Sequence, residues 1–383
     1  MSADRTVVVV GGGLAAARAC AALRRQGFAG RITLLGAEPH PPYDRPPLSK
    51  DVLAGKRDST ALPFDVAALR VDACPGEAAT GLDLARREVL TERRRLPFDG
   101  LVIATGATPV TVPGDGEQLV LRTIDDALAL RARLLPGARV VVVGASWIGA
   151  EVATAALAAG CRVACVEAGP APLARALGEA VGRHLLPWWA EVDLRTGALV
   201  DRVDREGVRL ADGTLLPADV VVTGVGVRPA VGWLGDSGLA VDGGGVAVDE
   251  RLRTGVPGVV AVGDVASRWS PRLSRRIRLE HWDEAGTAPA VAAAAVLADL
   301  DRDAPEPPAH DPVPYFWSDQ FGHKLQYAGA HDASDTVTVD FGQDGSGGLR
   351  ATWHDAAGRP TAWLGVDRAR ELVAARRALA QEG

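Results

Sequence analysis

The sequence predicts an α/β fold with two parallel-sheet domains and a small α+β domain at the C-terminus, from three observations. A run of valines ends in a glycine-rich turn and a helix-like stretch twice, at residues 6–27 and 139–160. A short apolar strand follows each copy, at 31–38 and 161–168. Beyond a proline-rich segment at 304–314, apolar residues alternate before an amphipathic stretch. Two copies indicate duplicated strand–turn–helix units, and the last pattern indicates a separate C-terminal part.

The charge and hydropathy of the chain argue against nucleic acid and membranes as partners. The formal net charge of −6 gives no general reason to expect nucleic acid or an anionic membrane. The N-terminus runs directly into the first apolar strand without a signal peptide, and the apolar run at 290–298 is too short to span a bilayer. We therefore expect a soluble, cytoplasmic protein.

The four cysteines, Cys20, Cys74, Cys161 and Cys165, are scattered along the chain. They lack the spacing of a metal site or of a disulfide framework. Cys161 and Cys165 flank a strand-like run, so we interpret them as small buried residues.

The first glycine-rich turn reads Gly11-x-Gly13-x-x-Ala16, with Glu38 at the end of the next strand. Gly11 permits the tight turn, Gly13 lets backbone amides approach a pyrophosphate, and Ala16 is small enough for helix–strand packing. Glu38 is placed to accept hydrogen bonds from ribose hydroxyls. Together with a second copy, this pattern predicts dinucleotide binding.

The second turn reads Gly144-x-Ser146-x-x-Gly149, with Glu167 ending its second strand. Ser146 replaces the middle glycine, which adds a hydroxyl where the phosphates are expected. Glu167 favours NADH over NADPH, because a carboxylate repels a 2′-phosphate. The alternative is that this second unit is a structural relic. Two such units, 133 residues apart, predict two Rossmann-like domains.

Clusters of glycine and proline indicate the domain boundaries. We expect a split first nucleotide domain at 1–112 and 242–308, a second nucleotide domain at 113–241 and a C-terminal interface domain at 309–383.

At this point a resemblance is evident. The stretches that carry the resemblance are GGGLAAA, PYDRPPLSK, ATGATP, LRTIDDA, GASWIGAEVA, GVGVRP, AVGDVA, EHW and PYFWSDQ. In them the chain resembles the FAD- and NADH-dependent ferredoxin reductases that serve Rieske oxygenases and bacterial haem monooxygenases. That group belongs to the pyridine nucleotide-disulfide oxidoreductase superfamily, which includes the glutathione reductases and apoptosis-inducing factor. The resemblance implies a glutathione-reductase-like arrangement of the domains. It covers residues 7 to about 330.

The proline-rich segment PHPPYDRPPLSK, residues 39–50, has a role under this resemblance. The disulfide reductases of the wider group carry a cysteine pair near this point, but here no cysteine occurs between Cys20 and Cys74. The prolines would instead fix the chain against the flavin. The resemblance implies that Lys50 reaches the reactive nitrogen of the flavin and pairs with Glu151, and an ammonium there would favour the anionic reduced flavin. The alternative is a plain interdomain salt bridge.

Other site residues follow from the matching motifs. Asp264 resembles the acceptor for the ribityl chain of FAD, although it could also be an ordinary helix N-cap. Trp317 resembles the aromatic that shields the mouth of the active site, and Trp147 is expected beside the nicotinamide. The remaining residues implied to contact FAD or NADH are Leu14, Ala15, Arg45, Ala79, Ala104, Thr105, Gly106, Arg122, Ile148, Gly226, Gly263, Glu280, His281 and Trp282.

The segment 267–278 carries five arginines, Arg268, Arg272, Arg275, Arg276 and Arg278. Such a patch near the redox centre of an acidic protein suits an acidic two-iron ferredoxin. The alternative is a solvated loop with incidental charge.

These features together indicate an NADH:ferredoxin oxidoreductase in which FAD accepts a hydride and passes single electrons to a ferredoxin that supplies an oxygenase. One alternative is an NADH-sensing flavoprotein of the apoptosis-inducing-factor type. Another is a different FAD- and NADH-dependent oxidoreductase without a redox cysteine.

Overall fold

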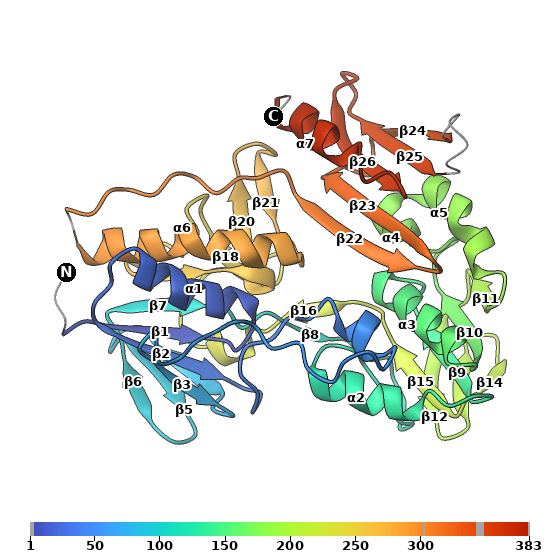
Figure 1. The fold of residues 1–383 in the computed structure, drawn as a ribbon, viewed down its shortest axis with the longest axis horizontal. Helices are drawn as coiled ribbons and strands as arrows, with labels where there is room; N and C mark the ends of the chain where they lie inside the picture. Colours follow the sequence, from blue (N-terminus) through green and yellow to red (C-terminus); the bar gives the residue numbers. More distant parts are fainter. Residues whose placement is uncertain (1–3, 302, 342–347, 382–383) are drawn as a thin grey trace.

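The computed structural model describes residues 4–301, 303–341 and 348–381, and its first parallel sheet is built from the N-terminal region and one later strand (Figure 1). Its strand order is β19-β7-β1-β2-β3, and every neighbouring pair is parallel. Valine-rich strands that are buried on both faces form such a sheet. The strands are β1 (Thr6–Val10), β2 (Arg31–Gly36), β3 (Val71–Pro75), β7 (Gly100–Ile103) and β19 (Val259–Ala261).

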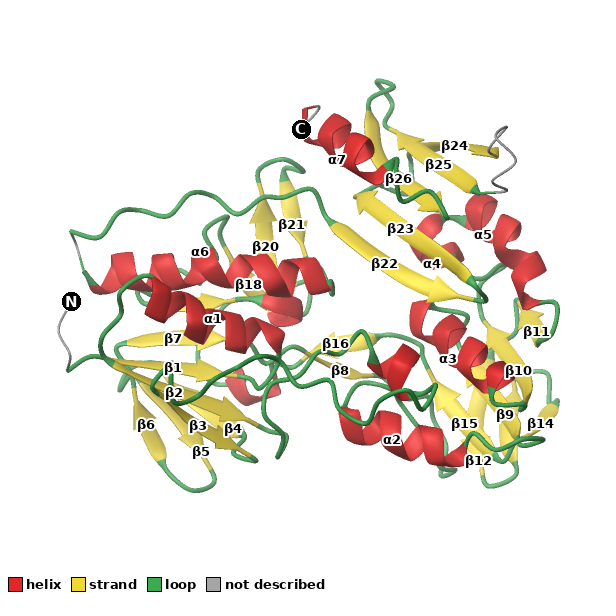
Figure 2. Cartoon of the chain, in the orientation of Figure 1, coloured by secondary structure: helices red, strands yellow, loops and turns green. Residues whose placement is uncertain are grey.

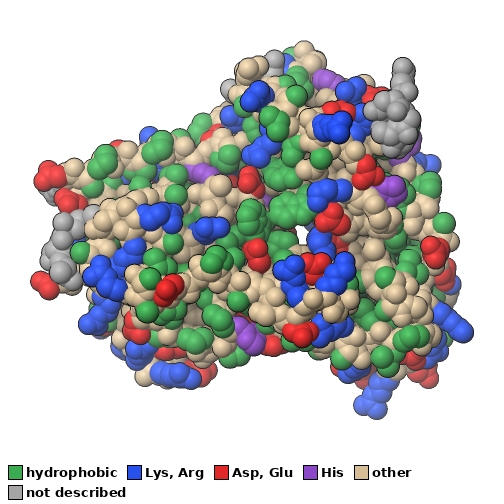
Figure 3. Space-filling model, viewed as in Figure 1, with side chains coloured by type: hydrophobic (Ala, Val, Ile, Leu, Met, Phe, Trp, Pro, Cys, Tyr) green, Lys and Arg blue, Asp and Glu red, His purple; other side chains and the backbone are tan. Residues whose placement is uncertain are grey.

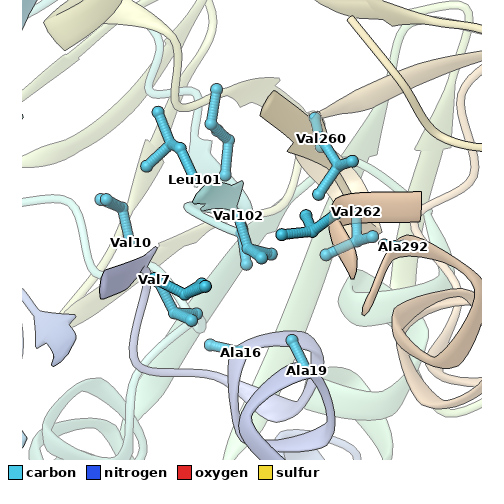
Figure 4. Packing of buried hydrophobic residues seen from close by; sticks show 14 of the residues in the cluster. Val7, Val10, Ala16, Ala19, Leu101, Val102, Val260, Val262 and Ala292 are labelled. Carbon is cyan, nitrogen blue, oxygen red and sulfur yellow. The ribbon is translucent and has the colours of Figure 1, made fainter. Parts of the chain in front are cut away.

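Two helices lie side by side on one face of this sheet, α1 (Leu14–Arg25) and α6 (Trp282–Leu300) (Figure 1). Small residues permit their close approach: Ala16 and Ala19 of α1 and Ala292 of α6 are fully buried. These alanines pack beside valines of β1, β7 and β19 in one core (Figure 4). The helix that begins at Leu14 therefore presents its first turn at the carboxyl end of β1.

The second parallel sheet has the order β11-β10-β9-β15. One of its two inner strands begins at Arg139, and the helix α3 (Trp147–Ala158) follows this strand after the second glycine-rich turn. Cys161 and Cys165 are buried here, as predicted. The elements of this region are α2 (Ile124–Arg133), β9 (Arg139–Val143), β10 (Arg162–Glu167), α4 (Ala174–Leu177), α5 (Glu179–Leu185), η2 (Leu186–Trp189), β11 (Asp193–Thr196) and β15 (Val220–Thr223).

Smaller sheets flank the two parallel ones, and they are antiparallel except for the parallel pair β18–β20 in the sheet β17-β18-β20-β21. The pair β8 (Ala107–Pro109) and β16 (Val227–Pro229) bridges them, so the predicted strands at 101–109 and 220–229 are each divided in two. The remaining elements are η1 (Leu48–Val52), β4 (Ala79–Asp83), β5 (Glu88–Thr91), β6 (Arg95–Pro97), β12 (Val200–Asp204), β13 (Gly207–Leu210), β14 (Leu215–Pro217), η3 (Gly232–Leu234), β17 (Val241–Asp242), β18 (Gly245–Val248), η4 (Gly263–Val265), β20 (Ala266–Ser270) and β21 (Arg275–Ile277).

The C-terminal part is an antiparallel sheet with the order β22-β23-β26-β25-β24 and one helix. Figure 2 shows this sheet above α3 and apart from the first parallel sheet. The elements are β22 (Tyr315–Gln320), β23 (His323–Gly329), β24 (Thr336–Phe341), β25 (Leu349–His354), β26 (Pro360–Val366) and α7 (Leu372–Gln381). The predicted fold class, with two Rossmann-like units and a small C-terminal α+β unit, is confirmed.

None of the helices in the described ranges is long and apolar enough to cross a membrane.

Candidate functional site

A cavity of about 900 Å³ lies where the two parallel sheets and the C-terminal sheet meet. Its walls come from the first glycine-rich turn, the proline-rich segment, the start of α3, the start of α6 and the strand β22. Figure 3 shows an opening in this part of the surface, with hydrophobic side chains on one side of it and charged side chains on the other. A concave site between domains, with a mainly apolar lining and a few polar groups, is typical of cofactor binding.

The first glycine-rich turn opens onto this cavity. Gly11 has φ +131°, and a Cβ there would lie 2.1 Å from the carbonyl oxygen of Ala104, so no other residue fits. A Cβ on Gly13 would meet none of the described atoms within 4 Å, which leaves room for a ligand beside the backbone. Gly13 is also the N-cap of α1, and no side chain in the described part of the chain caps it. These free amides and this space fit the pyrophosphate of FAD.

A polar network lines the wall of the cavity next to Glu38. Its carboxylate accepts hydrogen bonds from Arg45, at 2.8 Å, and from the hydroxyl of Tyr43. Arg45 also donates to the carbonyl oxygen of Arg122, whose Nη2 donates to Oδ2 of Asp264 at 2.7 Å. The network thus joins three chain segments, around residues 38–45, Arg122 and Asp264, on one side of the site.

Asp264 is not a helix N-cap, so that alternative reading of this residue was wrong. It lies inside the short turn η4, and the long helix α6 starts only at Trp282, with His281 at its N-cap. Because the chain continues from η4 into a strand, the Asp264 carboxylate is free to pair with Arg122 at the cavity wall.

Lys50 and Glu151 form an ion pair inside the cavity, with Nζ of Lys50 2.9 Å from Oε1 of Glu151. The Lys50 side chain is 23% exposed and that of Glu151 is 5% exposed. Lys50 comes from the tight turn η1, which the prolines precede, and Glu151 comes from the second turn of α3. The pair therefore joins the proline-rich segment to the second parallel-sheet unit, and the position of both residues agrees with the predicted pairing.

Two serines beside this pair were not predicted as site residues from the sequence. Ser49 donates a hydrogen bond to Oε2 of Glu151, and Ser318 donates to Oε1 at 2.5 Å. Both serines directly adjoin residues that the motifs singled out, Lys50 and Trp317. That adjacency was the available signal, but nothing local in the sequence shows that their hydroxyls converge on one carboxylate.

Aromatic rings form the wall between α6 and β22. Trp147 meets Phe316 edge-on at 4.6 Å, and Phe316 lies 4.7 Å from the ring of His281. Trp282 meets Trp317 edge-on at 6.0 Å and donates from Nε1 to Asp44 at 2.7 Å. Burial lowers the pKa of His281 to about 4, against the opposing charges of Glu284 and Asp264, so its ring is neutral at pH 7.

Of the second glycine-rich turn, Trp147 and Ile148 line the cavity, but Gly144, Ser146 and Gly149 do not. Oγ of Ser146 accepts from the amide of Gly149 at 3.2 Å and donates to the carbonyl oxygen of Gly224 at 2.7 Å, so this helix already has a side-chain cap. The carboxylate of Glu167 accepts from two backbone amides, those of Ala145 and Gly169. Both residues therefore shape the turn itself.

The cavity brings together most of the residues singled out from the sequence. Those that line it are Gly11, Gly13, Leu14, Ala15, Glu38, Arg45, Lys50, Ala79, Ala104, Thr105, Gly106, Arg122, Trp147, Ile148, Glu151, Gly263, Asp264, Glu280, His281, Trp282 and Trp317. Those outside its lining are Ala16, which is fully buried in the core, and Gly144, Ser146, Gly149, Glu167 and Gly226 of the second unit.

Arg268 is not a surface cation, contrary to the expectation of a five-arginine patch. Its side chain is 2% exposed and pairs with Glu284 and Asp311. The segment is a hairpin of β20 and β21, and the side chain of Arg268 points inward from it. The other arginines are also paired: Arg275 with Asp332, Arg276 with Asp242, Arg278 with Glu280, and Arg272 with carbonyl oxygens of α7.

Comparison with known proteins finds similarity over the whole chain. The family model described as pyridine nucleotide-disulphide oxidoreductase matches residues 5–288, and the reductase C-terminal model matches residues 315–383. The chain is 36% identical to the anthranilate 1,2-dioxygenase system ferredoxin–NAD(+) reductase component of Burkholderia cepacia, over 99% of this chain and 95% of that protein.

Solved structures are also similar to this chain over almost its whole length. The structure of Fdr9 matches with a TM-score of 0.95 and 55% identity, over 99% of this chain and 95% of that one. The reductase of the covalent putidaredoxin reductase–putidaredoxin complex matches with a TM-score of 0.90 and 31% identity, over 100% of this chain and 94% of that one.

Proposed function

Because this chain belongs to the pyridine nucleotide-disulphide oxidoreductase family, we propose that it passes electrons from NADH through FAD to a two-iron ferredoxin that supplies an oxygenase. It is a flavoprotein oxidoreductase whose cofactors are FAD and NADH. FAD supplies the conversion of a two-electron donor into one-electron steps. The proposed location is the cytoplasm.

The Lys50–Glu151 pair is the observation that carries this proposal. It places a cation inside the cavity at the junction of both nucleotide-binding units, 2.9 Å from its counter-ion. We assign Lys50 and Glu151 as the catalytic residues, which orient the reacting rings and balance charge between them. The residues of the first unit that line the cavity are the proposed FAD contacts.

The proposed NADH contacts are the second glycine-rich turn and Glu167. The hydrogen bonds of Ser146 and Glu167 hold this turn in shape at the end of β9. Trp147 and Ile148 start α3 and also line the cavity, so a nucleotide on this turn would extend along α3 toward Lys50. The proposed domain division is 1–112 with 242–308, 113–241, and 309–383.

The proposed ferredoxin docking face surrounds the hairpin β20–β21, with Arg272, Arg275, Arg276 and Arg278 as its cations. Arg278 lines the cavity, and the Arg275 side chain is 44% exposed. We expect Arg275→Ala to lower the rate of electron transfer to ferredoxin, and the loss to shrink as salt is raised. Arg86→Ala is the matched control, because Arg86 is also exposed and ion-paired but lies outside the cavity lining. Equal effects of the two variants would remove the hairpin from the docking face.

Anaerobic mixing with NADH tests the function directly. The flavin absorbance should bleach quickly, and adding a two-iron ferredoxin with cytochrome c should then give ferredoxin-dependent reduction of the cytochrome. A long-lived reduced complex that ferredoxins do not discharge would favour the NADH sensor instead. No bleaching would show that the second unit does not bind NADH productively.

A further inference from the structure

The carboxylate of Glu151 is the meeting point of three chain segments, and one of them is the C-terminal sheet. We propose that Ser318 is a positioning residue for the Lys50–Glu151 pair, with Ser49 holding the other carboxylate oxygen. In this way the C-terminal part of the chain would complete the cationic centre of the cavity. The inference deepens the proposed function and rests on it.

The hydrogen bonds to Glu151 leave its carboxylate little freedom. Oε1 receives Nζ of Lys50 at 2.9 Å, Oγ of Ser318 at 2.5 Å and the backbone amide of Asp319 at 3.3 Å. Oε2 receives the hydroxyl of Ser49. Ser318 is 1% exposed, so water does not compete at this point. Hydrogen bonds to a buried ionised group are stronger than those between neutral groups, and they fix its direction.

Gln320 determines where the Ser318 proton points. Its side-chain amide donates to Oγ of Ser318 at 2.9 Å, and Gln320 is itself buried. A hydroxyl has one proton to donate, and the side-chain NH2 of Gln320 is itself a donor and cannot take that proton. The Ser318 proton is therefore directed at Glu151, and the three side chains form one chain of hydrogen bonds that ends at Lys50.

The strand β22 is fixed to α3 by a second contact. The backbone amide of Phe321 donates to Oγ1 of Thr154 at 2.9 Å, one helical turn beyond Glu151. Thr154 thus holds the same strand on the same helix without touching the carboxylate. This separates a general role in docking the strand from a specific role in holding Glu151.

Loss of the Ser318 hydroxyl should change the charge balance in the cavity. The Glu151 carboxylate would lose a donor on the oxygen that faces Lys50, and its negative charge would be less compensated beside the site assigned to FAD. Added negative charge disfavours the reduced cofactor. We expect the flavin midpoint potential of Ser318→Ala to become more negative, and its reduction by NADH to slow about tenfold. The Kd for NADH should change less than twofold.

The experiment compares Ser318→Ala with Thr154→Val in the FAD-loaded protein. The midpoint potential is measured by titration with a chemical reductant, which needs neither NADH nor ferredoxin. The proposal is supported if the midpoint potential shifts in Ser318→Ala and is unchanged in Thr154→Val. Equal potentials in the wild type and both variants overturn it, and so does an equal shift in both variants.

A double mutant shows whether Ser318 acts through Glu151. In a Glu151→Gln background, Ser318→Ala should shift the potential much less than in the wild type. An undiminished shift would mean that Ser318 acts by another route, which overturns the proposal. If Ser318→Ala does not fold, Ser318→Cys replaces it in both comparisons, because it keeps the shape with a weaker donor. A wild type that dithionite reduces but NADH does not would refute the proposed function, while these potentials would still decide the role of Ser318.

Discussion

Arg268 and Glu284 form an ion pair inside the protein, with Nε of Arg268 3.4 Å from Oε1 of Glu284 and side chains that are 2% and 9% exposed. Asp311 and His310 complete the cluster, at 2.9 Å from Arg268 and 3.2 Å from Glu284. Burial opposes the charged form of Glu284, but the hydrogen bond and charge of His310 and the charge of Arg268 prevail, so the pKa of its carboxyl is lowered. The cluster joins α6 to the segment that leads into the C-terminal sheet.

Replacing Arg268 with alanine should destabilise the fold. The buried carboxylate of Glu284 and the mostly buried carboxylate of Asp311 would lose their cation, which costs about 3–5 kcal/mol in the free energy of unfolding. Urea denaturation measures this loss. Arg275→Ala should cost less than about 1 kcal/mol, because its partner Asp332 is exposed. Similar losses in the two variants would contradict the distinction between a buried and a surface arginine.

Replacing Lys50 with methionine should leave FAD bound and slow its reduction by NADH by about tenfold or more, since the cation that orients the reacting rings is lost. Stopped-flow absorbance of the flavin measures the rate. Lys56→Met is the control, because Lys56 is exposed and lies outside the cavity lining. An unchanged rate in Lys50→Met would remove Lys50 from the catalytic pair.

Replacing Glu167 with arginine should move the preference toward NADPH, raising the NADPH/NADH ratio of kcat/KM about tenfold or more. The protein should also lose stability, because the amides of Ala145 and Gly169 lose their acceptor. Glu191→Arg, on an exposed position of the same unit, controls for the added charge. The same ratio in the wild type and Glu167→Arg would place the ribose elsewhere.

The stability of the protein should fall as the pH is lowered from about 6.5 to 4, partly because of His281. Burial lowers the pKa of His281 to about 4. In this window the unfolded chain binds a proton at His281 that the folded chain does not, so acid favours unfolding, and the effect is absent above the ordinary pKa of histidine. His281→Asn should flatten the pH dependence of urea unfolding over this window. An identical slope in both proteins would show that His281 titrates normally.

Thiol alkylation should leave the flavin chemistry intact. Cys20, Cys161 and Cys165 are buried, and burial raises the pKa of each thiol. Cys74 is partly exposed, but burial and Asp72 raise its pKa too, so iodoacetamide at pH 8 should label this one thiol, and slowly. Mass spectrometry counts the labels, and Cys74→Ser should take up none. If alkylation stopped NADH from reducing the flavin, a thiol would belong to the electron path.

Much of the site could be predicted because its signals are local. The positive φ of Gly11 belongs to its own turn, and Lys50 follows a run of prolines that shapes its own segment. Arg268 could not be placed, because its burial depends on carboxylates 16 and 43 residues away. Ser318 meets Glu151 across 167 residues, a contact that only the docking of β22 on α3 creates. The role of Asp264, as helix N-cap or as acceptor in the site, was ambiguous because the sequence did not show where the next helix begins.

The alternation along β22 restricts how this chain can be recombined with its relatives. Side chains at every second position of β22 lie on the face toward Glu151, and these are Phe316, Ser318 and Gln320. On the other face, Tyr315 stacks with Trp317. A single residue inserted before Trp317 would move Trp317 to the position of Ser318 and place an indole against the carboxylate, and a single deletion there would place the side chain of Asp319 against it. A chimera that takes its C-terminal part from another protein must therefore keep the spacing between its crossover point and Ser318, or the graft will fold without a working redox centre.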